Sequence, residues 1–170
     1  PDLPCARTAA ELNALAGEPL ICTGTDAPGG KLTVPPVSLT ELARIYDYVL
    51  VEADGSAGRP MKAHAAHEPV IPPEARRRLL VVGASGFGLP IETAAHRPER
   101  YAALAGAALT DPVTPQTQAS VMLAEDLHDS VYLNQVEMPT AWAAAEELTR
   151  HLDCPVTAGS LHQGVFRRLR

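Results

Sequence analysis

Three features that define common protein classes are scarce in this sequence of 170 residues: cysteine, long apolar runs and positive charge. The three cysteines, Cys5, Cys22 and Cys154, are odd in number and widely spaced, so they give neither a disulfide framework nor a zinc-binding pattern. This usage agrees with a reducing, cytoplasmic setting. No apolar run approaches the roughly 20 residues that span a bilayer, and the first residues do not have the pattern of a signal peptide. We therefore expect a cytoplasmic protein without a membrane partner.

The scarcity of positive charge argues against a nucleic-acid partner. The formal net charge is −6, whereas non-specific binding of nucleic acid needs a basic face for the phosphates. The basic runs at 76–78 and 167–170 are too short to form one. What the sequence does have is material for a core, because 46% of its residues are hydrophobic and only 20% are charged. The length suits a single domain over residues 1–170.

Helix and strand patterns alternate along the chain. Capping-box patterns at Thr8 and Ser38 each predict the start of a helix. The apolar run Tyr48–Val51 is continuous rather than alternating, which indicates a strand buried on both faces. The predicted helices cover residues 8–16, 38–45, 98–105, 114–125 and 139–151, and the predicted strands cover 19–23, 48–53, 79–83, 130–134 and 155–158. This alternation predicts an α/β fold with a doubly wound, mainly parallel sheet.

The residues 29–31, Gly-Gly-Lys, look like part of a phosphate-binding loop. The full pattern requires Gly, four residues, Gly, Lys and then Ser or Thr, followed by a helix. Here Leu32 follows the lysine, and prolines at positions 35 and 36 prevent a helix. We therefore predict a turn into a short strand and find no phosphate-binding loop in the 170 residues.

Polar side chains gather instead in the long loop 54–73, directly after the strand predicted at 48–53. Ligands of parallel sheets bind at the carboxyl ends of strands, where nucleotide-binding α/β proteins hold magnesium with an acidic residue. Asp54 stands at this point; an isolated Asp-Gly is usually a tight turn, but the neighbouring polar residues favour a site. The catalytic candidates are Asp54 and Glu52, and the nucleotide- or ligand-binding candidates are Gly55, Ser56, Gly58, Arg59, Lys62, His67, Glu68 and Arg97.

Each of these residue types suits a bound phosphate in its own way. The glycines permit close approach of the backbone, and the Ser56 hydroxyl can donate to a phosphate oxygen. Arg59 and Lys62 supply positive charge for an anion. Arg97 is either a ligand contact or a polar entry to the helix that follows.

His64, His67 and Glu68 allow a second interpretation, a transition-metal site. A spacing of three would place both histidines on one side of a helix. However, prolines at positions 69 and 72 oppose a long helix, and no third ligand is identifiable. Ordering of the loop or contact with a ligand is the favoured role of these side chains.

A second candidate region follows the strand predicted at 130–134. Asn134 at the strand end, with Glu137 three residues later, has the layout of the base-reading Asn-Lys-x-Asp motif of guanine-nucleotide proteins. Gln135 and Glu137 replace its lysine and aspartate, so guanine specificity is not expected. An asparagine here also suits an ordinary strand-end turn. In the functional interpretation, Asn134 and Glu137 face a purine base.

The segment 51–72, Val-Glu-Ala-Asp-Gly-Ser-Ala-Gly-Arg-Pro-Met-Lys-Ala-His-Ala-Ala-His-Glu-Pro-Val-Ile-Pro, closely resembles the signature of the YqeC family of selenium-dependent hydroxylase accessory proteins. Segments 96–99 and 133–137 also fall where that family has His-Arg-Pro-Glu and an Asn-Lys-x-Asp-like motif. The resemblance covers roughly residues 10–160 and implies a fold like that of phosphate-loop NTPases. Family members begin with a Gly-Gly-Gly-Lys-Thr-Thr-like loop, so we expect this chain to be N-terminally incomplete.

The resemblance implies a role in the maturation of molybdenum hydroxylases that carry labile selenium. It implies a purine nucleotide, ATP or GTP, with magnesium, and leaves open whether the full-length protein is an NTPase. Asp54 would be the acid of the metal–phosphate site, with Glu52 and Ser56 beside it. One alternative is a non-catalytic binding or scaffold module that grips a cofactor or client enzyme through loop 54–73. The least favoured is a metal-dependent hydrolase that uses His64, His67 and Asp54.

Overall fold

The strands of this protein pair mainly in parallel in the computed structural model, which describes residues 3–170. Four of the six strand pairings in these residues are parallel, and helices alternate with the strands along the chain. The predicted α/β class with mainly parallel pairing is therefore confirmed. The doubly wound arrangement and the likeness to phosphate-loop NTPases stay predictions.

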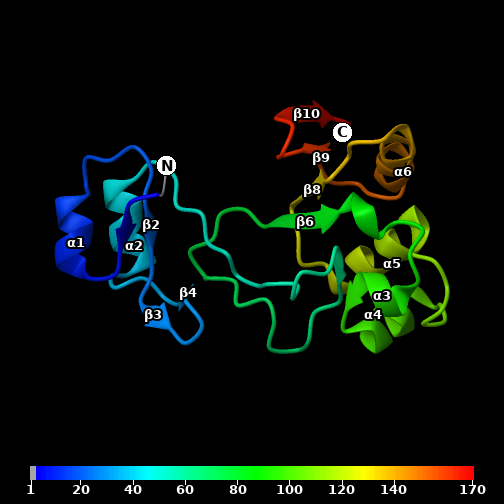
Figure 1. The fold of residues 1–170 in the computed structure, drawn as a ribbon, viewed down its shortest axis with the longest axis horizontal. Helices are drawn as coiled ribbons and strands as arrows, with labels where there is room; N and C mark the ends of the chain where they lie inside the picture. Colours follow the sequence, from blue (N-terminus) through cyan, green and yellow to red (C-terminus); the bar gives the residue numbers. More distant parts are fainter. Residues whose placement is uncertain (1–2) are drawn as a thin grey trace. The chain divides into compact units, whose positions relative to one another are not determined.

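The chain divides into two compact units, Pro1–Val51 and Glu52–Arg170 (Figure 1). Each unit has its own cluster of buried side chains. That residues 1–170 fold as one domain stays a prediction. None of the helices described at residues 3–170 has the length and hydrophobicity of a bilayer span.

The first unit has a small core beneath two short helices. Its elements are β1 (Cys5–Ala6), α1 (Ala9–Ala14), β2 (Cys22–Thr23), β3 (Asp26–Ala27), β4 (Lys31–Leu32) and α2 (Leu39–Ile45). Both predicted capping boxes are confirmed, since the hydroxyls of Thr8 and Ser38 accept from backbone N–H groups at the third helical position. Residues 29–31 form the turn between the antiparallel strands β3 and β4 and the start of β4, as predicted.

The prediction of a buried strand at 48–53 is wrong. The structure assigns no strand there, and Tyr48, Leu50 and Val51 are 87%, 92% and 47% exposed. Within residues 3–170 this run joins no sheet, and of its apolar side chains Val49 packs against the core of the first unit. Continuous hydrophobicity predicts that a segment can be buried, but it does not supply the neighbouring strand that buries it.

The second unit is built on a four-stranded sheet with the order β10-β9-β8-β6. Strands β6 (Leu79–Gly83), β8 (Ser130–Asn134) and β9 (Val156–Ser160) are parallel neighbours, and β10 (Val165–Arg168) joins β9 in antiparallel fashion. The sequence predicted the three parallel strands and missed β10. A separate parallel pair joins β5 (Met61–Lys62) to β7 (Ala95–His96).

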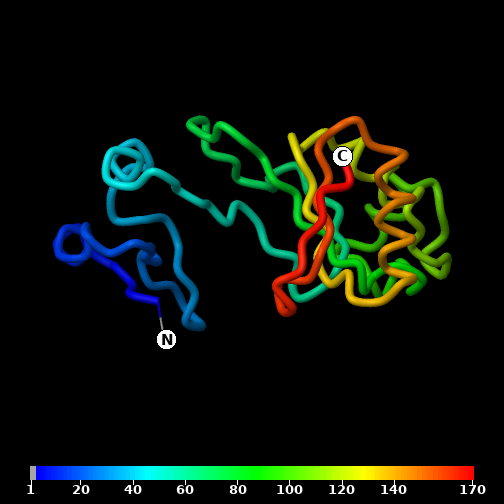
Figure 2. Tube along the Cα trace, turned by 90° about the horizontal axis from the view of Figure 1, so that it is seen from above, coloured from blue at the N-terminus to red at the C-terminus, as the bar shows by residue number. Residues whose placement is uncertain are grey.

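The helices of the second unit gather on one side of its sheet (Figures 1 and 2). They are η1 (Ala84–Gly86), α3 (Ile91–Ala94), α4 (Pro98–Ala105), α5 (Pro115–Glu125) and α6 (Pro139–Arg150). The side chains of Ile91, Tyr101, Leu133 and Leu148 are fully buried between helices and sheet. Because β6, β8 and β9 run in parallel, Gly83, Asn134 and Ser160 end at the same edge of the sheet.

Candidate functional site

The signature loop reaches the carboxyl edge of the sheet through Pro60. The Pro60 carbonyl accepts from the Gly83 N–H at 2.9 Å, where β6 ends. Only a glycine fits at Gly83, because a Cβ there would lie 2.6 Å from the Gln135 side-chain oxygen and 2.8 Å from the Pro60 Cβ. From Pro60 the chain enters β5, which pairs with β7 through Lys62 and His96.

Alternation along β5 separates apolar from polar side chains. Met61 and Ala63 are buried in the core of the second unit. Lys62 and His64 project from the other side, because successive side chains of an extended segment point to opposite faces. Both of them contact the Asp54 carboxylate, which brings the start of the loop back onto β5.

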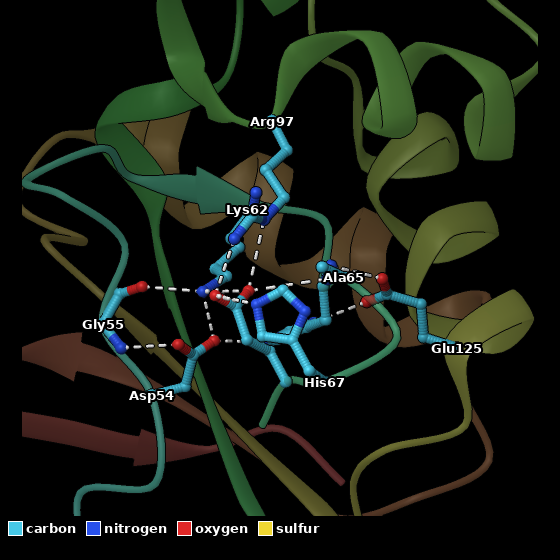
Figure 3. A network of polar contacts seen from close by, with 9 residues as sticks. Asp54, Gly55, Lys62, Ala65, His67, Arg97 and Glu125 are labelled. Atoms are coloured by element: carbon cyan, nitrogen blue, oxygen red, sulfur yellow. Dashed lines mark hydrogen bonds and ion pairs between the residues drawn. The ribbon is translucent and has the colours of Figure 1, made fainter. Parts of the chain in front are cut away.

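Lys62 is the cation at the centre of the site (Figure 3). Its ammonium forms ion pairs with Asp54 Oδ2 and, at 3.1 Å, with Glu68 Oε2, and it donates to the Gly55 carbonyl at 2.7 Å. Only 9% of the Lys62 side chain is exposed, so these carboxylates replace most of its water. An ammonium this buried requires such partners, because a lone buried charge is strongly destabilising.

His64 lies between two carboxylates. Its Nδ1 is 2.8 Å from Glu125 Oε2 and its Nε2 is 3.3 Å from Asp54 Oδ2. The His64 backbone N–H also donates to Glu125 Oε1 at 2.6 Å, which fixes the last residue of α5 against the loop. The two ring nitrogens of His64 therefore each face a different carboxylate, which connects α5 to the start of the loop.

Glu68 connects Lys62 to Arg97 at the start of α4. The Arg97 guanidinium donates to Glu68 twice, at 2.6 Å and 3.2 Å, in the paired geometry typical of arginine and carboxylate. The bond from Arg97, with a further contribution from Lys62, lowers the pKa of Glu68 to about 2. Glu68 is therefore charged throughout the physiological pH range.

Carboxylates outnumber the permanent cations in this network. Three carboxylates, those of Asp54, Glu68 and Glu125, face the two permanent cations Lys62 and Arg97. The His64 ring lies between two of these carboxylates. The site therefore gathers two cations and three acids at one place on the second unit.

The contacts of Asp54 do not fit a resident magnesium ion held directly by this carboxylate. Its Oδ1 accepts from the Gly55 N–H at 2.9 Å, and its buried Oδ2 is contacted by the Lys62 ammonium and the His64 ring. Among residues 3–170, no group of three His, Cys, Asp or Glu side chains is arranged to hold a metal ion. The transition-metal interpretation of His64, His67 and Glu68, which the sequence already disfavoured, gains no support from the residues that the structure describes.

The structure brings some of the predicted site residues together and leaves others apart. Asp54, Gly55, Lys62, Glu68 and Arg97 form one network, as described above. The exposed His67 ring lies at the rim of this network, with its Nε2 3.6 Å from Glu68 Oε1 (Figure 3). The predicted residues outside the network are Glu52, which is exposed; Ser56 and Gly58, which lie in a turn; and Arg59, whose guanidinium donates to the Thr93 carbonyl. The roles proposed for all of these residues stay predictions.

Glu125 is the member of the network that the sequence analysis missed. It lies 57 positions beyond Glu68 at the end of α5, and nothing in its local sequence marks it as functional. A signal was available in the prediction that a helix ends at this residue, since an acid at a helix C-terminus opposes the helix dipole and needs a partner. That partner is His64.

Asn134 and Glu137 form a second group at the same edge of the sheet. Asn134 Oδ1 accepts from the Tyr132 hydroxyl at 3.3 Å and from the Leu161 N–H at 3.1 Å. Glu137 Oε1 accepts from the Ser160 hydroxyl at 2.7 Å. Both side chains thus bind the segment that leaves β9, and Glu137 remains exposed to solvent. Their contact with a purine base stays a prediction.

Comparison with known proteins identifies the family but not a structural neighbour. Residues 4–99, more than half of the chain, match the family described as "YqeC protein". A relative from Escherichia coli (strain K12), "Uncharacterized protein YqeC", is 38% identical over 78 residues, which are 45% of this chain and 30% of the relative. No solved structure matches the chain significantly. The matched family segment contains the signature loop and all of the Asp54 network except Glu125, and the chain therefore belongs to the YqeC family.

Proposed function

We propose that this protein binds a purine nucleotide with magnesium as an accessory protein in the maturation of selenium-dependent molybdenum hydroxylases. Membership of the YqeC family supports the assignment to this kind of accessory protein. The observation that supports nucleotide binding is the ionic network around Lys62, in which two cations lie beside the carboxyl edge of a parallel sheet. The matched segment is 30% of its relative, so the activity of the whole protein is part of the proposal.

The nucleotide would use the two groups of residues at this edge for different parts of the molecule. Lys62 and Arg97 are the cations that phosphate oxygens require, and each is now neutralised by carboxylates. Asn134 and the exposed Glu137 carry the acceptors that suit a purine base. Magnesium would arrive bound to the phosphates rather than as a resident ion, in agreement with the contacts already made by Asp54.

Calorimetric titration of the full-length protein with magnesium-ATP and magnesium-GTP tests the proposal. Asp54→Asn should weaken binding at least about tenfold, which corresponds to about 1.4 kcal/mol. Asp129→Asn is the matched control, because Asp129 pairs with Arg78 through an aspartate–cation contact outside the network. Equal affinity of Asp54→Asn and the unaltered protein would refute the role of Asp54, and no binding of either nucleotide would refute the nucleotide itself.

The scaffold alternative makes a different prediction for the same loop. A module that grips a client enzyme needs the exposed side chains of the loop, such as His67, and not the buried Lys62 ammonium. His67→Ala would then reduce the binding of a molybdenum hydroxylase, measured by biolayer interferometry. Calorimetric titration of the protein with either nucleotide would show no binding. The accessory role itself predicts that loss of the gene lowers the activity of a selenium-dependent hydroxylase in the cell, and unchanged activity would contradict it.

A further inference from the structure

Two of the three cysteines of the chain are neighbours in the first unit, although 17 positions separate them in sequence. Cys5 and Cys22 are register partners of the parallel pair β1–β2, and both are free thiols. Adjacent strands lie about 4.8 Å apart, inside the range of about 4.4–6.8 Å between Cα atoms that a disulfide spans. Partners in register project from the same face of a sheet, so the two side chains lie side by side.

The face that carries these cysteines is accessible. Ala6 follows Cys5 in β1 and is fully buried against Leu12 and Leu42. Because side chains alternate along a strand, Cys5 projects away from that core, and both cysteines are only partly buried. A small reagent can therefore reach the pair.

The surroundings of the two sulfur atoms differ. Burial raises the pKa of the Cys22 thiol, and the adjacent Cys5 sulfur raises it further, so Cys22 keeps its proton at neutral pH. The Arg7 guanidinium lies near both cysteines and does not distinguish them. We assign the first attack to Cys5 because the raised pKa of Cys22 keeps that residue as a thiol.

We propose that Cys5 and Cys22 form a dithiol site that reduces the disulfide of a low-molecular-weight thiol. The Cys5 sulfur attacks one sulfur of that disulfide, so a mixed disulfide forms and the first thiol leaves. Cys22 then attacks the Cys5 sulfur, which forms the Cys5–Cys22 bond and releases the second thiol. The two cysteine protons end on the two released thiols, and two electrons pass from the cysteine pair to the small disulfide.

This inference is independent of the nucleotide proposal, since it concerns the first unit alone. It also differs from a structural disulfide framework, which the cysteine count excluded. A Cys5–Cys22 disulfide that forms and is reduced again as the ratio of oxidised to reduced small thiols changes suits a reducing setting, where such bonds are transient. Cys154 lies in the second unit and provides an internal control thiol.

The test exposes the chain to oxidised glutathione, quenches with acid, labels the remaining thiols with N-ethylmaleimide and identifies the products by intact and peptide mass spectrometry. The expected product has a Cys5–Cys22 bond, carries no glutathione on either residue and retains a labelled thiol at Cys154. Cys22→Ser should trap glutathione on Cys5, whereas Cys154→Ser should leave the Cys5–Cys22 bond unchanged. Circular dichroism of each variant establishes that it is folded.

A rate comparison separates a preformed pair from two cysteines that meet by chance. The bond should form at least about ten times faster in the folded chain than in urea, because the folded strands raise the effective concentration of one thiol at the other. Equal rates in the two conditions would overturn the proposal. So would a folded chain in which Cys5 and Cys22 both stay labelled by N-ethylmaleimide or each retain one glutathione.

Discussion

Removal of the Lys62 ammonium is the sharpest test of the ionic network. Lys62→Met keeps most of the aliphatic stem but leaves Asp54 and Glu68 without the cation between them. Loss of one partner from a buried ion pair costs about 3–5 kcal/mol, and the side chains concerned are only 9–18% exposed. We expect the free energy of unfolding to fall by about 3 kcal/mol, at the lower end because Arg97 still neutralises Glu68.

Urea unfolding followed by tryptophan fluorescence measures this loss, because the single tryptophan, Trp142, lies in the second unit with the network. Arg150→Met is the matched control, since Arg150 forms an exposed pair with Glu147 and should cost only about 0.5 kcal/mol. The double variant with Asp54→Asn should recover about 1–2 kcal/mol of the loss, because it removes a carboxylate left without its partner. A loss for Lys62→Met no larger than that of the control would refute the network as a stabilising feature.

Two further predictions concern Glu68 in the loop and Gly83 at the end of β6, where the loop approaches the sheet. Because the pKa of Glu68 is lowered from 4.5 to about 2, its contribution to stability is complete above about pH 4.5 and is lost as pH falls toward 2. Urea titrations from pH 5 to pH 3 should show the free energy of unfolding falling for this reason. In Glu68→Gln, this part of the pH dependence should be absent. Gly83→Ala should lower the free energy of unfolding by about 1–3 kcal/mol, since its Cβ would clash with Gln135 and Pro60. Gly55→Ala has open space and should be nearly neutral in the same urea assay, so equal effects of the two would contradict the close approach at Gly83.

The helices were the most predictable part of the fold, because their signals are local. Thr8 and Ser38 each carry a capping glutamate three residues on, and both helices begin there. The strand at 48–53 failed for the opposite reason, since strand pairing depends on a partner elsewhere in the chain. Strand β10 was missed because its residues, Val-Phe-Arg-Arg, place two apolar residues before two charged ones and do not alternate.

The candidate site was predictable where its residues follow one another in sequence. Asp54, Lys62 and Glu68 lie in one loop, and their clustering was visible as a concentration of polar residues. Their pairing was not visible, because it depends on the return of the loop to β5 and on the left-handed backbone of Arg97 (φ 60°), which places the guanidinium beside Glu68. Glu125 joins the network only through the packing of α5, which no local pattern encodes.

The contact between Asp54 and Lys62 also determines how the nucleotide titration should be interpreted. A phosphate that binds Lys62 must compete with the Asp54 carboxylate, because both are anions that use the same ammonium. If Asp54 served only to hold Lys62, Asp54→Asn would free the ammonium and tighten the binding of nucleotide without magnesium. If Asp54 contributes to a magnesium-bound nucleotide, the same substitution weakens binding, and the difference between titrations with and without magnesium shrinks. The sign of the change therefore separates a lysine-positioning role from the proposed one, which a loss of stability alone would not do.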